Sequence, residues 1–309
     1  PNVGLHIYGR YQCMLVSIFI RTLNEECYLG ELLRAIESQN VNGFSHEIVI
    51  VDSGSTDNTL KIAKSHNARI TYINKQDFTF GRSLNVGCDF ANGEYFIFIS
   101  GHCIPTDKDW LQNLTSPLIQ KKCDYTYGRQ IAKDTTKFSE MQVFEKYFPS
   151  TSNIPQDGFF CNNANAAISR TAWEKFHFDE SLTGLEDMFL AKQIYQNKGF
   201  IGYISDSVVY HIHDETWAQV KTRYEREAIA LQKIMPEIRI SIYNLVYFIA
   251  TSILKDTRDA IRERVFFKEI FSIFMFRFFQ YYGSYKGNHV CRKLSNRATM
   301  KYFYPNIKE

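Results

Sequence analysis

Apolar strand-like segments alternate with helical segments through the N-terminal third of the chain, and this alternation restricts the fold more than any other feature. Four apolar runs have the length and composition of strands, at residues 14–20, 46–52, 68–74 and 94–99. Helical segments separate them, the clearest at 27–39 and 81–92. Strands connected through helices pair in parallel, and the helices cover both faces of the sheet. The sequence therefore predicts an α/β fold with a mostly parallel, Rossmann-like central sheet, which binds ligands beyond the carboxyl ends of its strands.

The chain changes character near Pro236. Before this residue, helices and strands are mixed, and one helix is expected to end at Gly199, a favourable residue for a helix C-terminus. After it, residues 240–282 are helical, very aromatic and interspersed with Lys and Arg. We therefore expect an α/β domain over residues 1–235 and a helical region over residues 236–309.

The composition excludes several classes of protein. The chain has 309 residues and a formal net charge of +3, which is too small to indicate a nucleic-acid-binding protein. Its seven cysteines show no CxxC spacing, so neither a disulfide framework nor a zinc site is expected, and a reducing compartment fits better. The N-terminus lacks the apolar core of a signal peptide, and no apolar run reaches the roughly 18 residues that span a bilayer. We therefore expect a cytoplasmic protein.

A carboxylate stands at the end of the second predicted strand, in the stretch IVIVDSGSTD. Asp52 is followed by Ser53 and Gly54, small residues that let a ligand approach the backbone. Asp52 can accept hydrogen bonds from a nucleobase or a ribose hydroxyl, although a tight turn capped by its side chain explains the same pattern. The glycine patterns of dinucleotide-binding folds and P-loop nucleotidases do not occur after the first strand, which argues against both classes.

Two helix starts carry charged side chains. Arg82 and Asn85 lie where a helix begins, and an arginine there suits a phosphate or is simply exposed. Glu186 and Asp187 also begin a helix. One of these carboxylates can act as a general base while its neighbour binds a hydroxyl, or both can complement the helix dipole.

Histidines occur at two predicted strand ends. His211 and His213 are two residues apart, so on a strand they point to one face and can share a metal ion or a phosphate. The stretch ISGHCIP, which follows the fourth strand, contains His102 directly after Ser100 and Gly101. Strand ends are where such sheets hold their ligands, so this stretch is a further candidate site.

Taken in order, these motifs resemble the family 2 glycosyltransferases of the GT-A fold. Six pieces over about residues 15–213 follow the family's order: VSIFIRTLNEE, EIVIVDSGSTDNTL, GRSLNVGCDFANGEYFIFISGHCIP, NNANAAISRTAW, GLEDMFLAKQIYQNKG and VVYHIH. Each piece is weak alone, but six in order are specific. The later segment FRFFQYYGSYKG also looks like the end of bacterial members that build capsule, lipopolysaccharide or other surface glycans.

The resemblance implies an inverting transfer of a sugar from a nucleotide-diphospho-sugar to a hydroxyl of an oligosaccharide or lipid-linked glycan. A UDP-sugar is the favoured donor, and dTDP-, GDP- and CMP-linked sugars remain open. Asp187, with Glu186 beside it, matches the catalytic base, because an inverting displacement needs a carboxylate on the face opposite the leaving diphosphate. The implied donor site consists of Thr22, Glu25, Asp52, Ser53, Arg82, Asn85, Ser100 and Gly101. The implied acceptor cleft contains Asn162, Asn163 and Trp173.

One stretch departs from the family pattern, which has Asp-x-Asp after this strand with its last Asp on a divalent metal ion. Here Ser100-Gly101-His102 stands in that place. Because imidazole can bind Mn²⁺, we expect His102, with His211 or His213, to hold Mn²⁺ or Mg²⁺. Two alternatives stay open. One is a metal-independent enzyme in which a protonated histidine or Arg82 offsets the phosphate charge. The other is a weakly active or inactive protein that binds nucleotide sugars or glycans as a scaffold subunit.

The aromatic segment at residues 240–282 indicates a membrane surface as a further partner. Aromatic and aliphatic residues with interleaved Lys and Arg are typical of helices that lie in a membrane interface. The alternative is a helical subdomain that packs on the catalytic domain or forms a homo-oligomer. If the segment binds lipid, the protein is expected at the inner face of the cell membrane.

Overall fold

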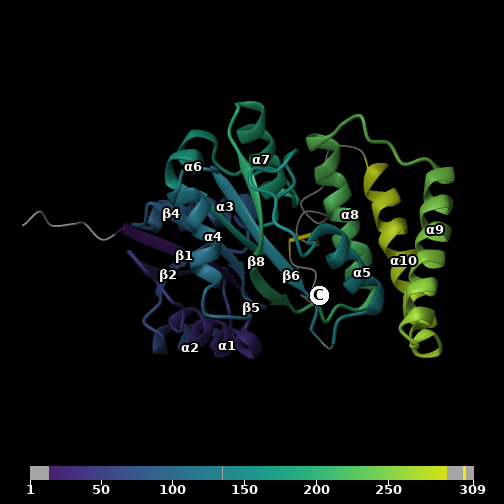
Figure 1. Ribbon diagram of the computed structural model, residues 1–309, viewed down its shortest axis with the longest axis horizontal. Helices are drawn as coiled ribbons and strands as arrows, with labels where there is room; N and C mark the ends of the chain where they lie inside the picture. The colour runs from purple at the N-terminus through teal and green to yellow at the C-terminus, as the bar shows by residue number, and fades with distance from the viewer. Residues whose placement is uncertain (1–13, 134, 291–301, 304–309) are drawn as a thin grey trace, which may run out of the picture.

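The structure, a computed structural model, describes residues 14–133, 135–290 and 302–303. Within these residues one sheet has the strand order β3-β2-β1-β4-β7-β6-β8-β5 (Figure 1). Its strands are β1 (Met14–Thr22), β2 (Phe44–Asp52), β3 (Arg69–Tyr72), β4 (Tyr95–Ser100), β5 (Cys103–Pro105), β6 (Tyr125–Ile131), β7 (Asn165–Ser169) and β8 (Ile201–His211). The pairs β2–β3, β1–β2, β1–β4 and β6–β8 are parallel, whereas β4–β7, β6–β7 and β5–β8 are antiparallel. The predicted α/β class with a mostly parallel sheet is confirmed.

Helices cover both faces of the sheet, as predicted. The helices of the described chain are α1 (Glu26–Glu37), α2 (Thr59–Ser65), α3 (Phe80–Phe90), α4 (Trp110–Ile119), α5 (Phe138–Tyr147), α6 (Arg170–Phe176), α7 (Glu186–Gln196), α8 (Trp217–Ile234), α9 (Ile242–Arg262) and α10 (Phe266–Asn288). In β1, Ile18 and Ile20 join an apolar cluster with α1, α2 and α4. Phe19, between them, joins a second cluster with α3, α6 and α7 on the opposite face. The strand's period of two thus builds both halves of the core.

The end of α7 differs from the prediction. The helix stops at Gln196, and the residue with the left-handed backbone is Lys198 rather than Gly199. The amide of Gly199 donates to the carbonyl of Ile194, which closes the helix end. A Cβ atom on Gly199 would lie 2.5 Å from the Ile194 side chain. Glycine is therefore needed here for space and not for its backbone conformation.

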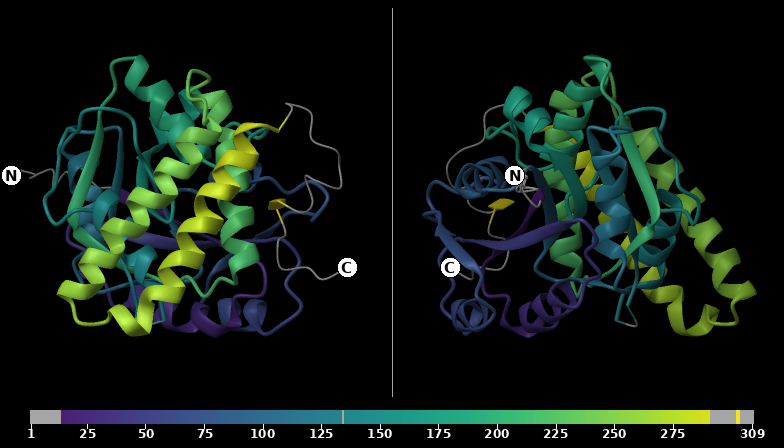
Figure 2. Two further views of the ribbon diagram at one scale, coloured as in Figure 1. Left: turned by 90° about the vertical axis from the view of Figure 1, so that its right-hand side faces the viewer. Right: turned by 60° about the vertical axis from the view of Figure 1, so that its left-hand side comes forward.

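The last three long helices form a separate layer beside the sheet (Figure 1; Figure 2, left). α10 packs against α8 and α9, and the ion pair between Asp256 and Arg277, 2.7 Å long and buried, joins α9 to α10. No helix in the described ranges is long and apolar enough to cross a membrane. The C-terminal helical region is present as expected. The domain boundary at residue 235 stays a prediction. α10, which follows this boundary, packs on α8, which precedes it.

Candidate active site at the strand ends

The ends of β1 and β2 meet at Asp52. The pairing register sets Thr22 opposite Asp52, and the Thr22 hydroxyl donates to the carboxylate at 2.9 Å. The amides of Gly54 and Ser55 donate to the other carboxylate oxygen at 2.9 and 3.0 Å. The backbone of Gly54 is left-handed, with φ of 101°, so Asp52 and Gly54 together shape a tight turn.

This arrangement uses the Asp52 carboxylate within the fold. Its side chain is 0% exposed, and both oxygens already accept hydrogen bonds within the turn. Thr22 and Ser53 are buried with it, and the Ser53 hydroxyl donates to the carbonyl of Thr22. These three residues form a buried group under the strand ends, and their part in donor binding stays a prediction.

Three histidines come together at the edge of the sheet. The stretch after β4 turns and continues as β5, a strand that the sequence did not predict. β5 pairs with the end of β8, and the amide of Ile212 donates to the carbonyl of His102. His102 therefore lies beside both His211 and His213, with ring centroids 5.3 and 6.0 Å away, and the rings of His211 and His213 are themselves 4.0 Å apart. One nitrogen atom from each ring lies within 4.8 Å of the others.

Hydrogen bonds orient two of these rings. Nδ1 of His211 lies 2.6 Å from Oε1 of Gln130, and Nδ1 of His213 lies 2.6 Å from Oε1 of Glu140. Amide and carboxylate oxygens accept hydrogen bonds, so each ring donates from Nδ1, which leaves Nε2 for another partner. Burial lowers the pKa of His211 well below its ordinary value, with further contributions from the neighbouring histidines and Arg223. His211 is therefore a neutral imidazole at neutral pH.

Glu140 and Arg223 form a charged layer behind His213 that the sequence analysis missed. Arg223 donates to Glu140 at 2.5 Å and to Glu215 at 2.7 Å. Burial alone would raise the pKa of Glu140, but Arg223 and His213 outweigh it and bring this pKa to about 2. Glu140 is thus an ionised, buried acceptor that holds His213.

Glu25 and Gly101 lie beside His102. Oε1 of Glu25 is 3.7 Å from Nδ1 of His102, and both side chains are partly exposed. A Cβ atom on Gly101 would lie 3.0 Å from Cγ of Glu25, so glycine makes room for this carboxylate. Ser100, at the end of β4, donates its amide to the carbonyl of Ala164. A carboxylate therefore stands next to the histidine cluster.

Glu186 and Asp187 begin α7, as predicted. Leu185 before them has a left-handed backbone with φ of 55°, which is unusual for a non-glycine residue and marks a constrained turn. The Asp187 carboxylate accepts the amide of Asn163 at 2.8 Å and that of Met188 at 2.7 Å. Burial, followed by the charge of Glu186, raises the pKa of Asp187 to about 7. A carboxyl with this pKa suits a general base at neutral pH.

A hydrogen-bonded path joins the histidines to Asp187. Gln130, which holds His211, donates from Nε2 to Oδ1 of Asn162 at 2.9 Å. The next residue, Asn163, donates its amide to Asp187. The predicted metal ligands, the acceptor-loop asparagines and the predicted base therefore belong to one connected site.

Two arginines that the sequence analysis missed flank this site. Nη1 of Arg21 lies 3.4 Å from Oε1 of Glu186, and the guanidinium lies 5.2 Å from the Phe80 ring centroid. Arg226, on α8, stacks on the same ring at 4.5 Å. The one sequence signal for Arg21 was that it is a charged residue at the end of the apolar run that forms β1. Arg226 had no such signal, because it reaches the site only through the packing of α8.

Three predicted site residues make contacts within the fold. The side-chain amide of Asn85 makes four hydrogen bonds, with Trp173, Phe178 and Glu180, and so has no capacity left for a donor substrate. The Trp173 ring is buried against Phe96, so it offers no surface to an acceptor sugar. Arg82 pairs with Glu180 at 2.8 Å near the start of α3, its side chain is partly exposed, and its contact with a donor stays a prediction.

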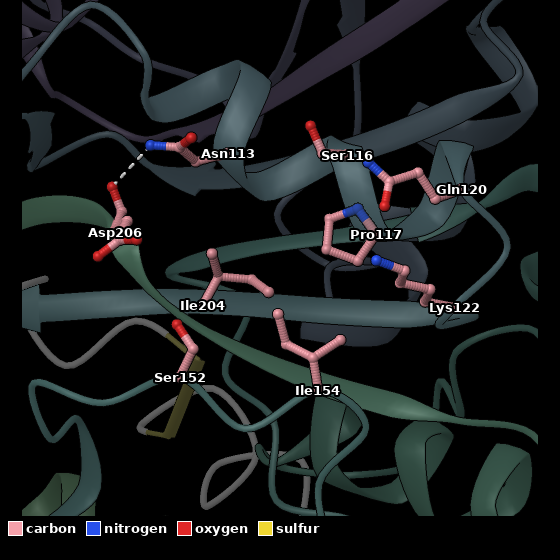
Figure 3. A pocket seen from close by; sticks show the side chains of 9 residues that line it. All are labelled: Asn113, Ser116, Pro117, Gln120, Lys122, Ser152, Ile154, Ile204 and Asp206. Carbon is pink, nitrogen blue, oxygen red and sulfur yellow. Dashed lines mark hydrogen bonds between the residues drawn. The ribbon is translucent and has the colours of Figure 1, made fainter.

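A separate pocket of about 340 Å³ lies between α4, β8 and the loop that contains Ser152 (Figure 3). Asn113 and Asp206 lie together at one end of it, where the Asn113 side-chain amide donates to the backbone carbonyl of Asp206. None of the residues that line this pocket is a predicted site residue. The first half of the loop at residues 149–161 therefore borders this pocket, whereas its end leads to Asn162 and Asp187.

Comparison with known proteins decides the family. The family model described as Glycosyl transferase family 2 matches residues 17–176. The chain belongs to glycosyl transferase family 2. It is therefore a glycosyltransferase, and the resemblance drawn from the sequence motifs is confirmed.

Curated relatives of this glycosyltransferase act on polymers, according to their names. It is 28% identical over 230 residues to the O-antigen chain rhamnosyltransferase RfbN of Salmonella typhimurium, over 68% of this chain and 70% of that protein. It is 25% identical over 266 residues to the poly(ribitol-phosphate) beta-N-acetylglucosaminyltransferase TarS of Staphylococcus aureus, over 82% of this chain. The match spans 43% of TarS, so it covers less than half of that protein.

Solved structures share the fold. The structure of TarS 1–349 in complex with UDP-GlcNAc matches 88% of this chain and 91% of that chain, with a TM-score of 0.51 and 17% identity. The mannosyltransferase PcManGT from Pyrobaculum calidifontis, in complex with GDP-Man and Mn²⁺, matches 94% and 88%, with a TM-score of 0.59 and 16% identity. These likenesses confirm the predicted GT-A fold.

Proposed function

We propose that this glycosyltransferase transfers a sugar, with inversion, from a nucleotide-diphospho-sugar to a hydroxyl group of a bacterial surface glycan. The path from His211 through Gln130 and Asn162 to the loop that holds Asp187 carries the proposal. It connects a group of metal-binding side chains to a carboxyl whose pKa is about 7. Both serve glycosyl transfer from a diphosphate, because charge develops on the leaving group while the attacking hydroxyl loses a proton.

Asp187 is the proposed general base. The amides of Asn163 and Met188 each occupy one lone pair of its carboxylate, and each oxygen keeps a second lone pair for an acceptor hydroxyl. The proton then passes from the hydroxyl to Asp187 as the new glycosidic bond forms and the bond to the diphosphate breaks. Glu186, which pairs with Arg21, is the residue proposed to orient the acceptor.

The histidine cluster fits a divalent cation. Because Gln130 and Glu140 hold Nδ1 of His211 and His213, their Nε2 atoms are left as ligands, with His102 as the third. Of the two cations considered, Mn²⁺ suits imidazole nitrogen better than Mg²⁺, which demands oxygen ligands in an octahedral shell. Such a cation, when bound, supplies positive charge that stabilises the leaving diphosphate.

The donor and acceptor are proposed from the relatives. UDP remains the favoured nucleotide, supported by the UDP-GlcNAc complex of TarS, while the GDP-Man complex of PcManGT keeps GDP open beside dTDP and CMP. The names of the O-antigen and poly(ribitol-phosphate) relatives support a polysaccharide acceptor of the capsule or lipopolysaccharide type. Asn162 and Asn163, next to Asp187, remain the proposed acceptor contacts. A scaffold role is not favoured, because the base and its supporting hydrogen bonds are all present.

Substitution of the proposed base and of one proposed metal ligand tests this function. Asp187→Asn is expected to reduce turnover by about 10² to 10⁴-fold, because the hydroxyl then has no proton acceptor. Thermal-shift titration with UDP-sugars should still detect donor binding by this variant. In the unmodified enzyme, turnover should rise with pH through about 7, as the carboxyl of Asp187 ionises.

His102→Ala should abolish Mn²⁺ binding in calorimetry together with Mn²⁺-dependent transfer. Asp89→Asn and His66→Ala, which lie outside the site, are the controls and should behave as the unmodified enzyme does. Full transfer by Asp187→Asn would overturn the assignment of the base. Equal transfer in Mn²⁺ and in EDTA would favour the metal-independent alternative.

A further inference from the structure

An aromatic stripe runs along the outer side of α10. Phe267, Phe271, Phe274, Phe278 and Tyr282 follow each other at intervals of four, three, four and four residues, which places them on one helix face. All five are exposed, Phe267 by 93% and Phe271 by 68%. Phe278 stacks on both Phe274 and Tyr282, with planes 7° and 10° apart. Apolar surface that is this continuous marks a binding face.

α9 adds a second exposed apolar row. Tyr243, Val246, Tyr247, Leu254 and Ile261 lie toward one side of this helix, and Tyr243 is 84% exposed. The two antiparallel helices form a hairpin along the outside of the molecule, and Figure 2, left, views it from that side. The apolar rows therefore belong to one outward-facing hairpin, residues 242–288.

Basic side chains accompany these rows. Residues 242–288 contain seven Lys and Arg against four Asp and Glu, a net charge of +3, which equals the formal net charge of the whole chain. Of the acids, Asp256 is buried with Arg277, while Asp259 and Glu269 pair with Arg262 and Lys268. Lys255, Arg258 and Arg264 are also exposed, and the remaining acid, Glu263, is exposed beside Arg262 and Arg264. Exposed bases therefore outnumber exposed acids on the hairpin, although Lys286 pairs with Glu225 of α8.

The hairpin is held firmly in place. The guanidinium of Arg277 binds Asp256 through two hydrogen bonds of 2.7 and 2.9 Å and also donates to the carbonyl of Ser139 on α5. Gly283 and Gly287 contact the backbone of α8 closely. The apolar rows are thus presented on a rigid support, so their exposure is a property of the fold.

We propose that the outward face of the α9–α10 hairpin binds the surface of a membrane that carries anionic lipids. The aromatic rows would enter the headgroup region, and the Lys and Arg side chains would contact lipid phosphates. A second copy of the chain is a poorer partner, because two positively charged faces would repel and the cores of protein interfaces are poor in Lys. If the proposed transfer is correct, this orientation holds the enzyme beside a lipid-linked acceptor, although lipid binding itself does not depend on the transfer.

Vesicle flotation with the full chain tests the proposal. The unmodified protein should float with vesicles of phosphatidylcholine and phosphatidylglycerol, float poorly with phosphatidylcholine alone, and dissociate as salt is raised. Phe267→Ser with Phe271→Ser should weaken binding by about tenfold or more. Lys255→Glu with Arg258→Glu should do the same, because each basic residue contributes about fivefold near an anionic surface.

Matched controls use exposed residues elsewhere: Tyr72→Ser with Tyr195→Ser, and Lys61→Glu with Lys64→Glu on α2. These should bind vesicles as the unmodified protein does, and unchanged thermal midpoints will show that all variants are folded. Absence of flotation by the unmodified protein, or equal loss in the controls, would overturn the proposal. A second result would also overturn it: the unmodified protein sediments as a dimer and does not bind vesicles, and Phe267→Ser with Phe271→Ser dissociates that dimer. Loss of sugar transfer without loss of flotation would instead count against the proposed function.

Discussion

At the scale of single residues, the Glu140 side chain orients one of the three clustered histidines. Oε1 of its carboxylate accepts hydrogen bonds from Nδ1 of His213 and from the guanidinium of Arg223. The second oxygen, Oε2, is buried without a hydrogen-bond partner in the structure. Such a carboxylate fixes the tautomer and the orientation of a metal-binding imidazole. Glu140 is therefore a positioning residue, which acts through His213.

Glu140→Gln tests this role. Glutamine keeps the shape and one acceptor oxygen but loses the charge, so the affinity for Mn²⁺ should fall by about 10 to 100-fold. Calorimetric titration with Mn²⁺ measures this directly, without an assay of transfer. Glu145→Gln, on an exposed position of the same helix, should leave the affinity unchanged. Equal affinity for Mn²⁺ in Glu140→Gln and the unmodified protein would contradict the role.

At the scale of elements, contact between α8 and α10 depends on two glycines. A Cβ atom at Gly283 would lie 2.4 Å from the carbonyl oxygen of Lys221, and one at Gly287 would lie 2.2 Å from that of Glu225. Both obstacles are backbone atoms of α8, which a rotamer change cannot move. The close approach of these helices fixes where the α9–α10 hairpin sits.

Gly283→Ala should therefore destabilise the protein by about 1–3 kcal/mol, since the helices must separate to admit the methyl group. Gly30→Ala is a matched control inside α1, because its Cβ would meet only the end of the Arg34 side chain and Ile62 at 3.4 and 3.7 Å. This control should be neutral or stabilising by about 0.5–1 kcal/mol, since alanine favours helix. Urea unfolding measures both. A Gly283→Ala variant as stable as the control would show that α10 can shift freely.

For the whole molecule, the groups whose pKa changes on folding set how stability depends on pH. The folded state lowers the pKa of Glu47, Asp57, Glu140, Asp179, Glu180 and Glu215, and that of His46 and His211. It raises the pKa of Asp187 and Glu227. Groups with a lowered pKa lose their stabilisation as pH falls, because the unfolded chain then binds more protons. The two raised carboxyls act in the opposite sense and lose stabilisation as pH rises toward 7.

The thermal midpoint should consequently change little between about pH 5 and 7 and fall steeply below about pH 4.5, where the unfolded chain protonates the six carboxylates. Calorimetry in buffers from acid to neutral pH measures this, without added divalent cations so that ligand binding does not contribute. A midpoint higher at pH 3.5 than at pH 6 would show that the raised carboxyls outweigh the lowered ones.

The sequence by itself determined the α/β class, the strands β1 to β4 and the family. The periods of strands and helices and the short motifs depend only on residues that are near each other in the chain. It also indicated that His102, His211 and His213 belong together, although the strand β5 that joins them was not predicted. Only the tertiary structure decided that the Asp52 side chain is buried and that Trp173 belongs to the core. It also decided that Glu140 binds both His213 and Arg223. Glu140 and His213 are 73 residues apart, and such contacts form only when separate helices pack on the sheet, so no local pattern reports them.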